Sequence, residues 1–134
     1  MKNMKKINIM KKIFMGLAMM ASLTVMAQTA ANEATPAQFP GGDGKMTGYI
    51  EQNLQYPAAA LRNGIEGVVE VRFIVKTDGT REQLTIVRLV DPDLETEAIR
   101  LVDGMPAWIP AMSAGKPIDS ETNVRIPFML PDQD

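Results

Sequence analysis

Cysteine and histidine are both absent from this 134-residue chain. Without them, disulfides, Cys-His nucleophile pairs, Ser-His-Asp triads and imidazole or thiolate metal ligands are impossible. Three serines are present (Ser22, Ser113 and Ser120), but no histidine can activate them. The carboxylates show no paired spacing that indicates acid–base catalysis. We therefore expect a non-enzymatic protein without metal or cofactor, whose fold is held together by packing alone.

Basic residues are scarce outside the first dozen positions. Five of the 14 lysines and arginines lie there, whereas all 16 acidic residues lie beyond residue 30. The formal net charge of −2 becomes −7 once residues 1–27 are removed, because nine basic groups then remain against 16 acidic ones. This balance argues against nucleic acid or anionic lipid as the main partner.

The N-terminal apolar run is shorter than the roughly 20 residues that a membrane span takes. It covers residues 13–26, follows several lysines and ends in a small residue, Ala27. This order predicts a secretory signal over residues 1–27 and export to the periplasm; an uncleaved signal would anchor the protein in the inner membrane. Residues 28–38 are small and polar, so we expect a disordered linker there. One domain over residues 39–134 follows.

A glycine-rich turn at Gly41 and Gly42 precedes the first expected helix, for which Asp43 is a candidate N-cap. A phosphate-binding loop is the alternative for the glycine pair. No strand precedes it and no GxGxxG or GK[ST] pattern follows, so a flexible entry to a helix is favoured. Four apolar residues then recur at helical spacing: Met46, Tyr49, Ile50 and Leu54.

The stretch from Tyr56 to Val90 predicts a short helix that leads into an antiparallel hairpin. Pro57 suits the first helical position, and Gly64 can supply a left-handed stop. Beyond Gly67 the apolar residues alternate, which is typical of a strand with one buried face. That face holds Val69, Val71, Phe73 and Val75. Asp78-Gly79 tolerates the positive φ of a tight hairpin turn, and the second strand is expected over residues 83–90.

A second long helix is expected after the hairpin, with Asp91 or Asp93 as its cap and Pro106 at its end. The acidic residues at its start superficially resemble a calcium loop, but the central Gly and the closing Glu of that motif are missing. Helix capping explains them better. We expect Trp108 to lie in the core rather than to form a ligand platform, because the chain has few other aromatics. The buried stripe of the helix is Leu94, Ala98, Leu101, Val102 and Met105.

The end of the chain predicts a turn over residues 114–117 and a last strand with alternating faces. One face holds Val124, Ile126, Phe128 and Leu130, and the other holds Arg125, Pro127 and Met129. A proline inside a strand is tolerated mainly at the edge of a sheet. This strand is therefore expected to be an edge strand.

Short motifs occur in a fixed order from about residue 39 to residue 130. They are Phe39-Pro40-Gly41-Gly42, Asn53-Leu54-Gln55-Tyr56-Pro57, Gly64-Ile65-Glu66-Gly67, Thr77-Asp78-Gly79, Asp91-Pro92, Glu97-Ala98, Met105-Pro106-Ala107-Trp108-Ile109-Pro110, Gly115-Lys116-Pro117 and Ile126-Pro127-Phe128. No single motif is specific, but their order and spacing resemble the C-terminal domain of TonB-family proteins.

The resemblance implies an α+β fold, in which a three-stranded antiparallel sheet packs on a helix near residues 93–104, with an extra N-terminal helical segment. In the family, this domain lies in the periplasm and binds an extended segment of outer-membrane transporters, the TonB box, by β-strand addition to its last strand. By position, the partner-strand residues here are Val124, Arg125, Ile126, Pro127, Phe128 and Met129. The accessory contact is Gln55, Tyr56 and Pro57.

Two functions follow as expectations. The first is a periplasmic TonB-like protein that binds TonB-dependent outer-membrane receptors in energised nutrient or siderophore uptake. Full-length family members carry a transmembrane anchor and a long Pro-rich spacer, whereas the linker expected here reaches only about 36 Å. An anchored inner-membrane motor partner would therefore supply the force. The alternative is a soluble periplasmic adaptor, or a homodimer, that uses the same edge without the motor.

Overall fold

The computed structural model of the protein describes residues 33–132. The signal expected over residues 1–27 and the first part of the expected linker lie outside these residues. Residues 35–112 and the chain from residue 116 onward form one compact unit. The other described residues, 33–34 and 113–115, fall in a second unit, where Ala114 and Gly115 have φ of 51° and 75° and form a turn.

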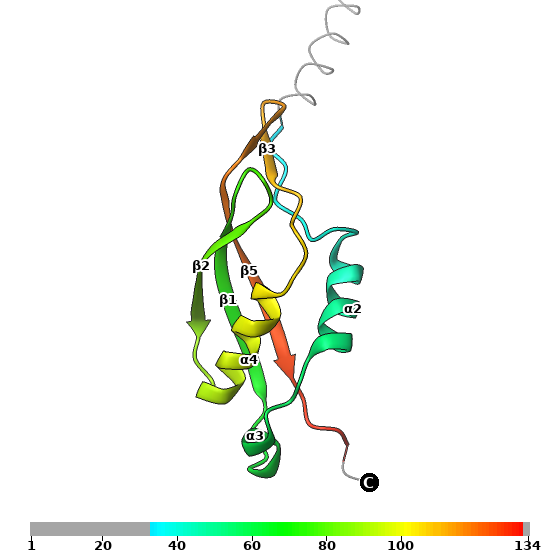
Figure 1. Ribbon diagram of the computed structural model, residues 1–134, viewed down its shortest axis with the longest axis vertical. Coiled ribbons are helices and arrows are strands. Elements are labelled where there is room, and N and C mark those ends of the chain that lie inside the picture. The colour runs from blue at the N-terminus through cyan, green and yellow to red at the C-terminus, as the bar shows by residue number, and fades with distance from the viewer. Residues whose placement is uncertain (1–32, 133–134) are drawn as a thin grey trace, which may run out of the picture. The chain divides into compact units, whose positions relative to one another are not determined.

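The helices and strands make an α+β fold, as expected (Figure 1). The elements are α2 (Asp43–Asn53), α3 (Ala58–Arg62), β1 (Gly67–Val75), β2 (Arg81–Arg88), α4 (Pro92–Asp103), β3 (Ala111–Ser113), β4 (Lys116–Ile118) and β5 (Ser120–Phe128). The main sheet has the order β2-β1-β5 with all neighbours antiparallel, which confirms the predicted three-stranded sheet. β3 and β4 form a separate two-stranded sheet.

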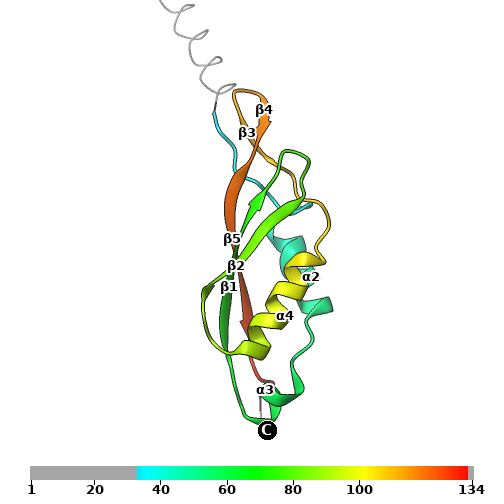
Figure 2. The same ribbon diagram turned by 60° about the vertical axis from the view of Figure 1, so that its left-hand side comes forward.

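The core lies between the sheet and the helices. α4 and α2 lie on the same side of the sheet (Figure 1, Figure 2). The hydroxyl of Tyr49 on α2 donates to the carbonyl of Leu101 on α4 at 3.0 Å. The predicted apolar faces are confirmed, because all their strand and α4 residues are buried except Leu130. These are Val69, Val71, Phe73, Val75, Leu94, Ala98, Leu101, Val102, Met105, Val124, Ile126 and Phe128.

The two long helices begin differently. Asp91 is the N-cap of α4, and its carboxylate accepts from the backbone N–H groups of Asp93 and Leu94 at 3.0 and 3.3 Å. For α2, the expectation that Asp43 is the cap is wrong: Gly42 takes the N-cap position without a side-chain bond, and Asp43 lies in the first turn. Gly41 and Gly42 both have positive φ and form the turn before α2;. The helix therefore begins one residue earlier than expected, with Gly42 as its N-cap. Asp43 in the first turn lies near the positive end of the helix dipole, where a negative charge is favourable;.

Several boundaries differ from those expected. β2 covers residues 81–88 instead of 83–90, and α4 ends at Asp103 with Gly104 as its C-cap, before Pro106. Lys116 lies in β4 rather than in a turn. Leu130 lies beyond the end of β5, and its N–H donates to the carboxylate of Glu66 at 2.6 Å.

The last part of the expected linker pairs with the segment that follows α4. Thr35 forms an antiparallel bridge with Met112, and Gln38 forms one with Ile109. The four backbone hydrogen bonds of these bridges measure 2.8 to 3.0 Å. The segment after α4 has backbone groups outside any helix or main-sheet ladder, and such groups require partners. Residues 35–38 supply them, and Ala37 also packs against the core, so this segment is ordered by backbone pairing and one side-chain contact.

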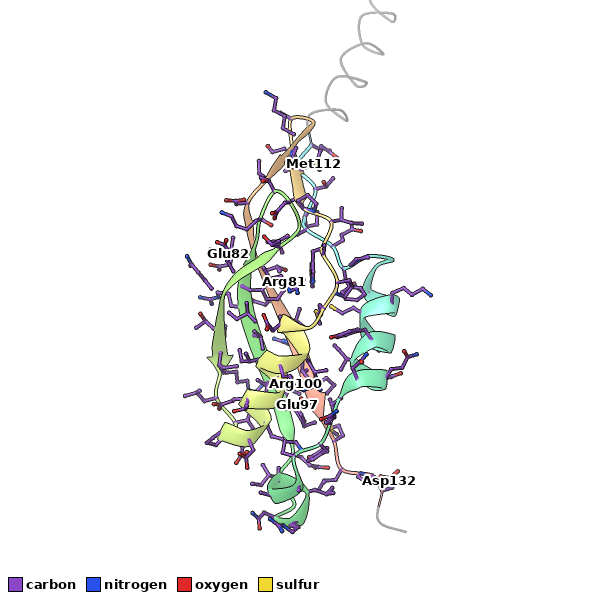
Figure 3. The ribbon with its side chains drawn as sticks, viewed as in Figure 1. Arg81, Glu82, Glu97, Arg100, Met112 and Asp132 are labelled. Carbon is purple, nitrogen blue, oxygen red and sulfur yellow. The ribbon has the colours of Figure 1, made fainter. Side chains whose placement is uncertain are left out.

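Arg81, at the start of β2, holds the C-terminal end of α4 and the loop beyond it (Figure 3). Its guanidinium donates to the carbonyls of Pro106 at 2.8 Å, Asp103 at 3.0 Å and Met105 at 2.6 Å. A cation is favourable there because the last carbonyls of a helix carry partial negative charge. Desolvation is the main cause that lowers the pKa of Arg81. This residue therefore joins the hairpin to the helix.

The side chain of Trp108 lies in the core, which confirms that expectation. Its ring packs edge-on against Phe73 and Phe39, with centroid distances of 5.2 and 6.0 Å. Its backbone N–H donates to the carbonyl of Gly79 in the hairpin turn at 2.9 Å. The hairpin, the loop after α4 and the start of the domain thus meet at this residue.

Candidate functional site

The open edge of β5 is the most regular exposed backbone surface of the main sheet. β5 pairs with β1 through nine consecutive residues, from Ser120 opposite Val75 to Phe128 opposite Gly67, without a register shift. Its other side has no neighbouring strand within residues 33–132, and in that part of the chain no backbone hydrogen bond joins β5 to a segment other than β1. Such an edge presents unpaired N–H and C=O groups that can accept another strand. The prediction of an edge strand is confirmed.

The opposite edge of the sheet, β2, is irregular. Its ladder with β1 has two register shifts, one between the partners of Glu70 and Val71 and one between those of Arg72 and Ile74. Gln83 in β2 has φ of 55°, a conformation that is uncommon for a residue other than glycine;. Bulges of this kind bend an edge strand and interrupt its pairing. Only β5 therefore offers a straight edge over its whole length.

The side chains of β5 divide into two sets. Val124, Ile126 and Phe128 are buried in the core, so that only their backbone is available to a partner. Arg125 and Pro127 are exposed on the other face, and Met129 follows the end of the strand with 67% of its surface exposed. The six predicted partner-strand residues thus comprise three that hold the strand in place and three that a partner could touch.

The solvent face of the β1–β5 pair carries a ladder of charges. The Oε2 atom of Glu70 lies 3.6 Å from Nε of Arg125, and Oε1 of Glu70 accepts a hydrogen bond from the side-chain amide of Asn123 at 2.9 Å. Nε of Arg72 lies 3.4 Å from Oε1 of Glu121. The Arg72–Glu121 pair is exposed at both residues, and pairs of that kind contribute only about 0–1 kcal/mol each;. Glu70 keeps only 17% of its side-chain surface exposed. Glu121 and Arg125 keep 62% and 74% of their side-chain surface exposed, so both charges remain accessible.

The predicted accessory contact, residues 55–57, lies at the C-terminal end of β5. The rings of Tyr56 and Phe128 pack edge-on with centroids 5.8 Å apart, and the Tyr56 hydroxyl donates to the carbonyl of Ile65. Burial raises the pKa of Tyr56, and the nearby charge of Glu66 raises it further. The structure therefore places residues 55–57 beside the predicted edge, where both could contact one bound chain.

Glu97 and Arg100 on α4 hold this corner in place, a role that the sequence did not indicate (Figure 3). Glu97 is buried, and its carboxylate accepts from the backbone N–H of Gln55 at 2.8 Å. Arg100 donates to Glu97 and, at 2.9 Å, to the carbonyl of Asn53. A glutamate within an apolar stripe, three residues from an arginine, is the signal that could have identified this pair.

A cleft of about 430 Å³ lies between this corner and α4. Its walls combine one aromatic ring with carboxylates and a guanidinium. It is lined by Gln55, Tyr56, Pro57, Ala58, Asp93, Thr96, Glu97 and Arg100. Among residues 33–132, no group of three or more acidic side chains is arranged to hold a metal ion.

The fold and its open edge define a class, that of small α+β domains with a regular unpaired strand. A family model, Gram-negative bacterial TonB protein C-terminal, matches residues 52–130. The chain belongs to this family, whose domains are non-enzymatic interaction modules that contact outer-membrane receptors. None of the helices in the described part of the chain has the length and apolar character to cross a membrane.

Two NMR solution structures of the Helicobacter pylori TonB C-terminal domain, residues 194–285 and residues 179–285, align with this chain. Each is 23% identical to it with a TM-score of 0.49, and each alignment covers 66% of this chain. The alignments cover 94% and 80% of those two chains. The comparison with curated proteins gives no match.

Proposed function

We propose that this protein is exported to the periplasm and binds extended segments of TonB-dependent outer-membrane transporters by β-strand addition to β5, in energised nutrient or siderophore uptake. One observation carries the proposal: β5 is paired over nine residues on one side, and within residues 33–132 no strand lies on the other. Membership of the TonB C-terminal family supports it. An anchored inner-membrane motor partner would supply the force.

The direction of the backbone groups limits where a partner can pair. In an antiparallel ladder, successive residues direct their N–H and C=O groups to alternate sides. The Lys76 N–H donates to the Thr80 carbonyl at 2.8 Å in the hairpin, so the even-numbered residues of β1 point toward β2 and the odd-numbered ones toward β5. The register places odd-numbered residues of β1 opposite even-numbered residues of β5, such as Val71 opposite Val124, so the even-numbered residues of β5 point toward β1. Pro127 then has its nitrogen on the open side, where a missing N–H costs the β1 ladder nothing.

The donors of the open side are therefore the N–H groups of Glu121, Asn123 and Arg125. Pro127 offers no donor and limits pairing at the C-terminal end. A partner strand of about five residues would lie along residues 121–125, and its continuation would pass Pro127 toward residues 55–57. The corner held by Glu97 and Arg100 would then contact the chain beyond the paired strand.

A titration with TonB-box peptides tests this proposal. We compare the full chain with Asn123→Pro, which removes the central outward N–H, and with Asn123→Ala, which keeps it. Both variants lose the Asn123–Glu70 side-chain bond, so they differ only in the backbone. We expect Asn123→Ala to bind within about twofold of the original and Asn123→Pro to bind at least tenfold more weakly, as follows from one lost hydrogen bond and a blocked neighbour. Equal binding by both variants, with native far-UV spectra, would refute β-strand addition at this edge.

A second candidate function, a homodimer, is favoured by the charges on β5. Glu121 and Arg125 lie symmetrically about Asn123. If two copies of β5 pair in antiparallel fashion about Asn123, Glu121 of each copy lies opposite Arg125 of the other. Sedimentation across a concentration series tests this, because Glu121→Arg would place like charges opposite each other and shift the equilibrium to monomer. A monomer at all concentrations would eliminate the homodimer.

A further inference from the structure

The four methionines of residues 33–132 differ in how far solvent reaches them. Met105 is buried in the core with 4% of its surface exposed, and Met46 and Met112 are half-buried. Met129 is exposed over 67% of its surface. A dissolved reagent therefore reaches Met129 more easily than the other three.

The chain on both sides of Met129 holds its side chain in solvent. Phe128, the last residue of β5, is fully buried, and the N–H of Leu130 donates to the carboxylate of Glu66 at 2.6 Å. Successive side chains of an extended chain point to opposite faces, so Met129 lies on the same face as the exposed Pro127;. A rotation that buried Met129 would break the contacts of its two neighbours.

The thioether of an exposed methionine reacts with two-electron oxygen donors such as hydrogen peroxide and hypochlorous acid. With peroxide, a lone pair of Sδ attacks one oxygen, the O–O bond breaks, an S–O bond forms and water leaves. The sulfur is oxidised by two electrons and the peroxide is reduced by two. The product, methionine sulfoxide, is polar and is reduced again by the two methionine sulfoxide reductases, one for each epimer.

Met129 also lies where a bound chain depends most on side-chain contact. Of the three exposed residues at the predicted edge, Arg125 is charged and Pro127 offers no backbone donor, which limits pairing at this end. Met129 supplies flexible apolar surface beyond it;. A sulfoxide at this position would have to lose its hydration before a partner could cover it, which costs free energy.

We propose that Met129 is an oxidation site, at which a two-electron oxygen donor forms a sulfoxide that weakens the binding of an extended partner chain. This inference rests on the proposed β-strand addition at β5. The site would make receptor binding sensitive to oxidants in a reversible way, because reduction of the sulfoxide restores the apolar side chain.

A time course of the full chain in hydrogen peroxide, followed by mass spectrometry of its peptides, tests the site. We expect sulfoxide at Met129 first, at Met46 and Met112 later and at Met105 last, in the order of their exposure. Treatment with both reductases should return Met129 to the thioether. Oxidation of Met105 before Met129, or of all four at one rate, would overturn the assignment.

Titration with TonB-box peptides before and after peroxide treatment tests the effect on binding. We expect the affinity to fall about three- to tenfold, which corresponds to part of one apolar side chain withdrawn from contact. Met129→Gln, which places a permanent polar side chain of similar length there, should bind as weakly without oxidant. The affinity of Met129→Leu should not change on peroxide treatment, whereas Met112→Leu, altered outside β5, should keep the loss.

The outcomes separate this inference from the function on which it rests. If the untreated chain binds the peptides and full sulfoxide at Met129 leaves the affinity unchanged, strand addition stands and the oxidation effect is refuted. An equal loss in Met129→Leu would assign the effect to another methionine and overturn the proposal. If the untreated chain binds no TonB-box peptide, strand addition is refuted and the weakening with it, while the peptide map still decides where oxidation occurs.

Discussion

Replacing Gly79 by alanine should destabilise the protein far more than the same change at Gly64. Both residues have positive φ, 84° at Gly79 and 66° at Gly64, so both changes carry the strain of a left-handed L-residue, about 1–2 kcal/mol;. A Cβ at Gly79 would lie 2.2 Å from the carbonyl oxygen of Trp108 and 3.2 Å from its nitrogen. At Gly64 nothing lies within 4 Å.

The extra cost at Gly79 follows from what must move. The neighbour is backbone, and its N–H donates to the Gly79 carbonyl at 2.9 Å, so relief of the clash disturbs that bond and the packing of the Trp108 ring. Overpacking of a fixed site costs about 1–3 kcal/mol. We therefore expect a total loss of about 2–5 kcal/mol for Gly79→Ala against about 1–2 for Gly64→Ala.

Urea unfolding followed by the fluorescence of Trp108, the single tryptophan, measures both variants. The midpoint of Gly79→Ala should fall well below that of Gly64→Ala, with a changed native emission spectrum because the indole shifts. Equal midpoints for the two variants would show that the turn and the loop after α4 are not in close contact. The reasoning from steric contact would then be refuted.

Three further changes test other contacts of the domain. Glu97→Ala should lower the free energy of unfolding by about 1–3 kcal/mol, since it removes a buried acceptor;. The same change should weaken peptide binding. Glu51→Ala, a control at an exposed position, should change neither quantity. Asp91→Ala should cost about 1 kcal/mol through loss of the α4 cap, measured by the same urea midpoint. The hydrogen bond from Lys76 lowers the pKa of Asp119, so stability from this group is present above its unfolded pKa and lost as pH falls through the folded pKa. Asp119→Asn should therefore flatten the acid limb of a stability–pH curve, and an unchanged limb would contradict the Lys76–Asp119 pairing.

Much of the fold could be predicted from local pattern. The alternation of apolar residues in β1 and β5 identified their buried faces, and the spacing of Leu94, Ala98 and Leu101 identified that of α4;. Pro127 indicated an edge strand because a central strand needs the N–H that proline lacks. These features depend on residues within one element, which is why the sequence alone contains them.

Other features depend on contacts between distant segments. Glu97 binds the Gln55 N–H from 42 residues away, and Arg81 reaches carbonyls 22 to 25 residues downstream. Contacts between residues so far apart in the chain leave no periodic pattern in the sequence. The pairing of residues 35–38 with the segment after α4 was likewise missed, because backbone bonds formed by small polar residues have no composition of their own;.

The sequence also did not predict that one edge strand of the sheet is irregular and the other regular. Both strands of the hairpin read as regular, yet β2 carries two register shifts and β5 carries none. Bulges depend on how an extra residue is accommodated against the partner strand, and nothing in the run of residues 81–88 marks where that happens. The sequence predicted β5 as an edge strand through Pro127, but the interruption of the opposite edge at β2 required the structure.

Amide hydrogen exchange along β5, with and without a bound TonB-box peptide, tests the central claim most directly. β-strand addition predicts that the amides of Glu121, Asn123 and Arg125 gain protection on binding, whereas those of Val124 and Ile126, already paired with β1, change little. This alternation arises only if a partner strand pairs with the open side of β5. Peptide binding without any gain of protection at those three amides would contradict the account.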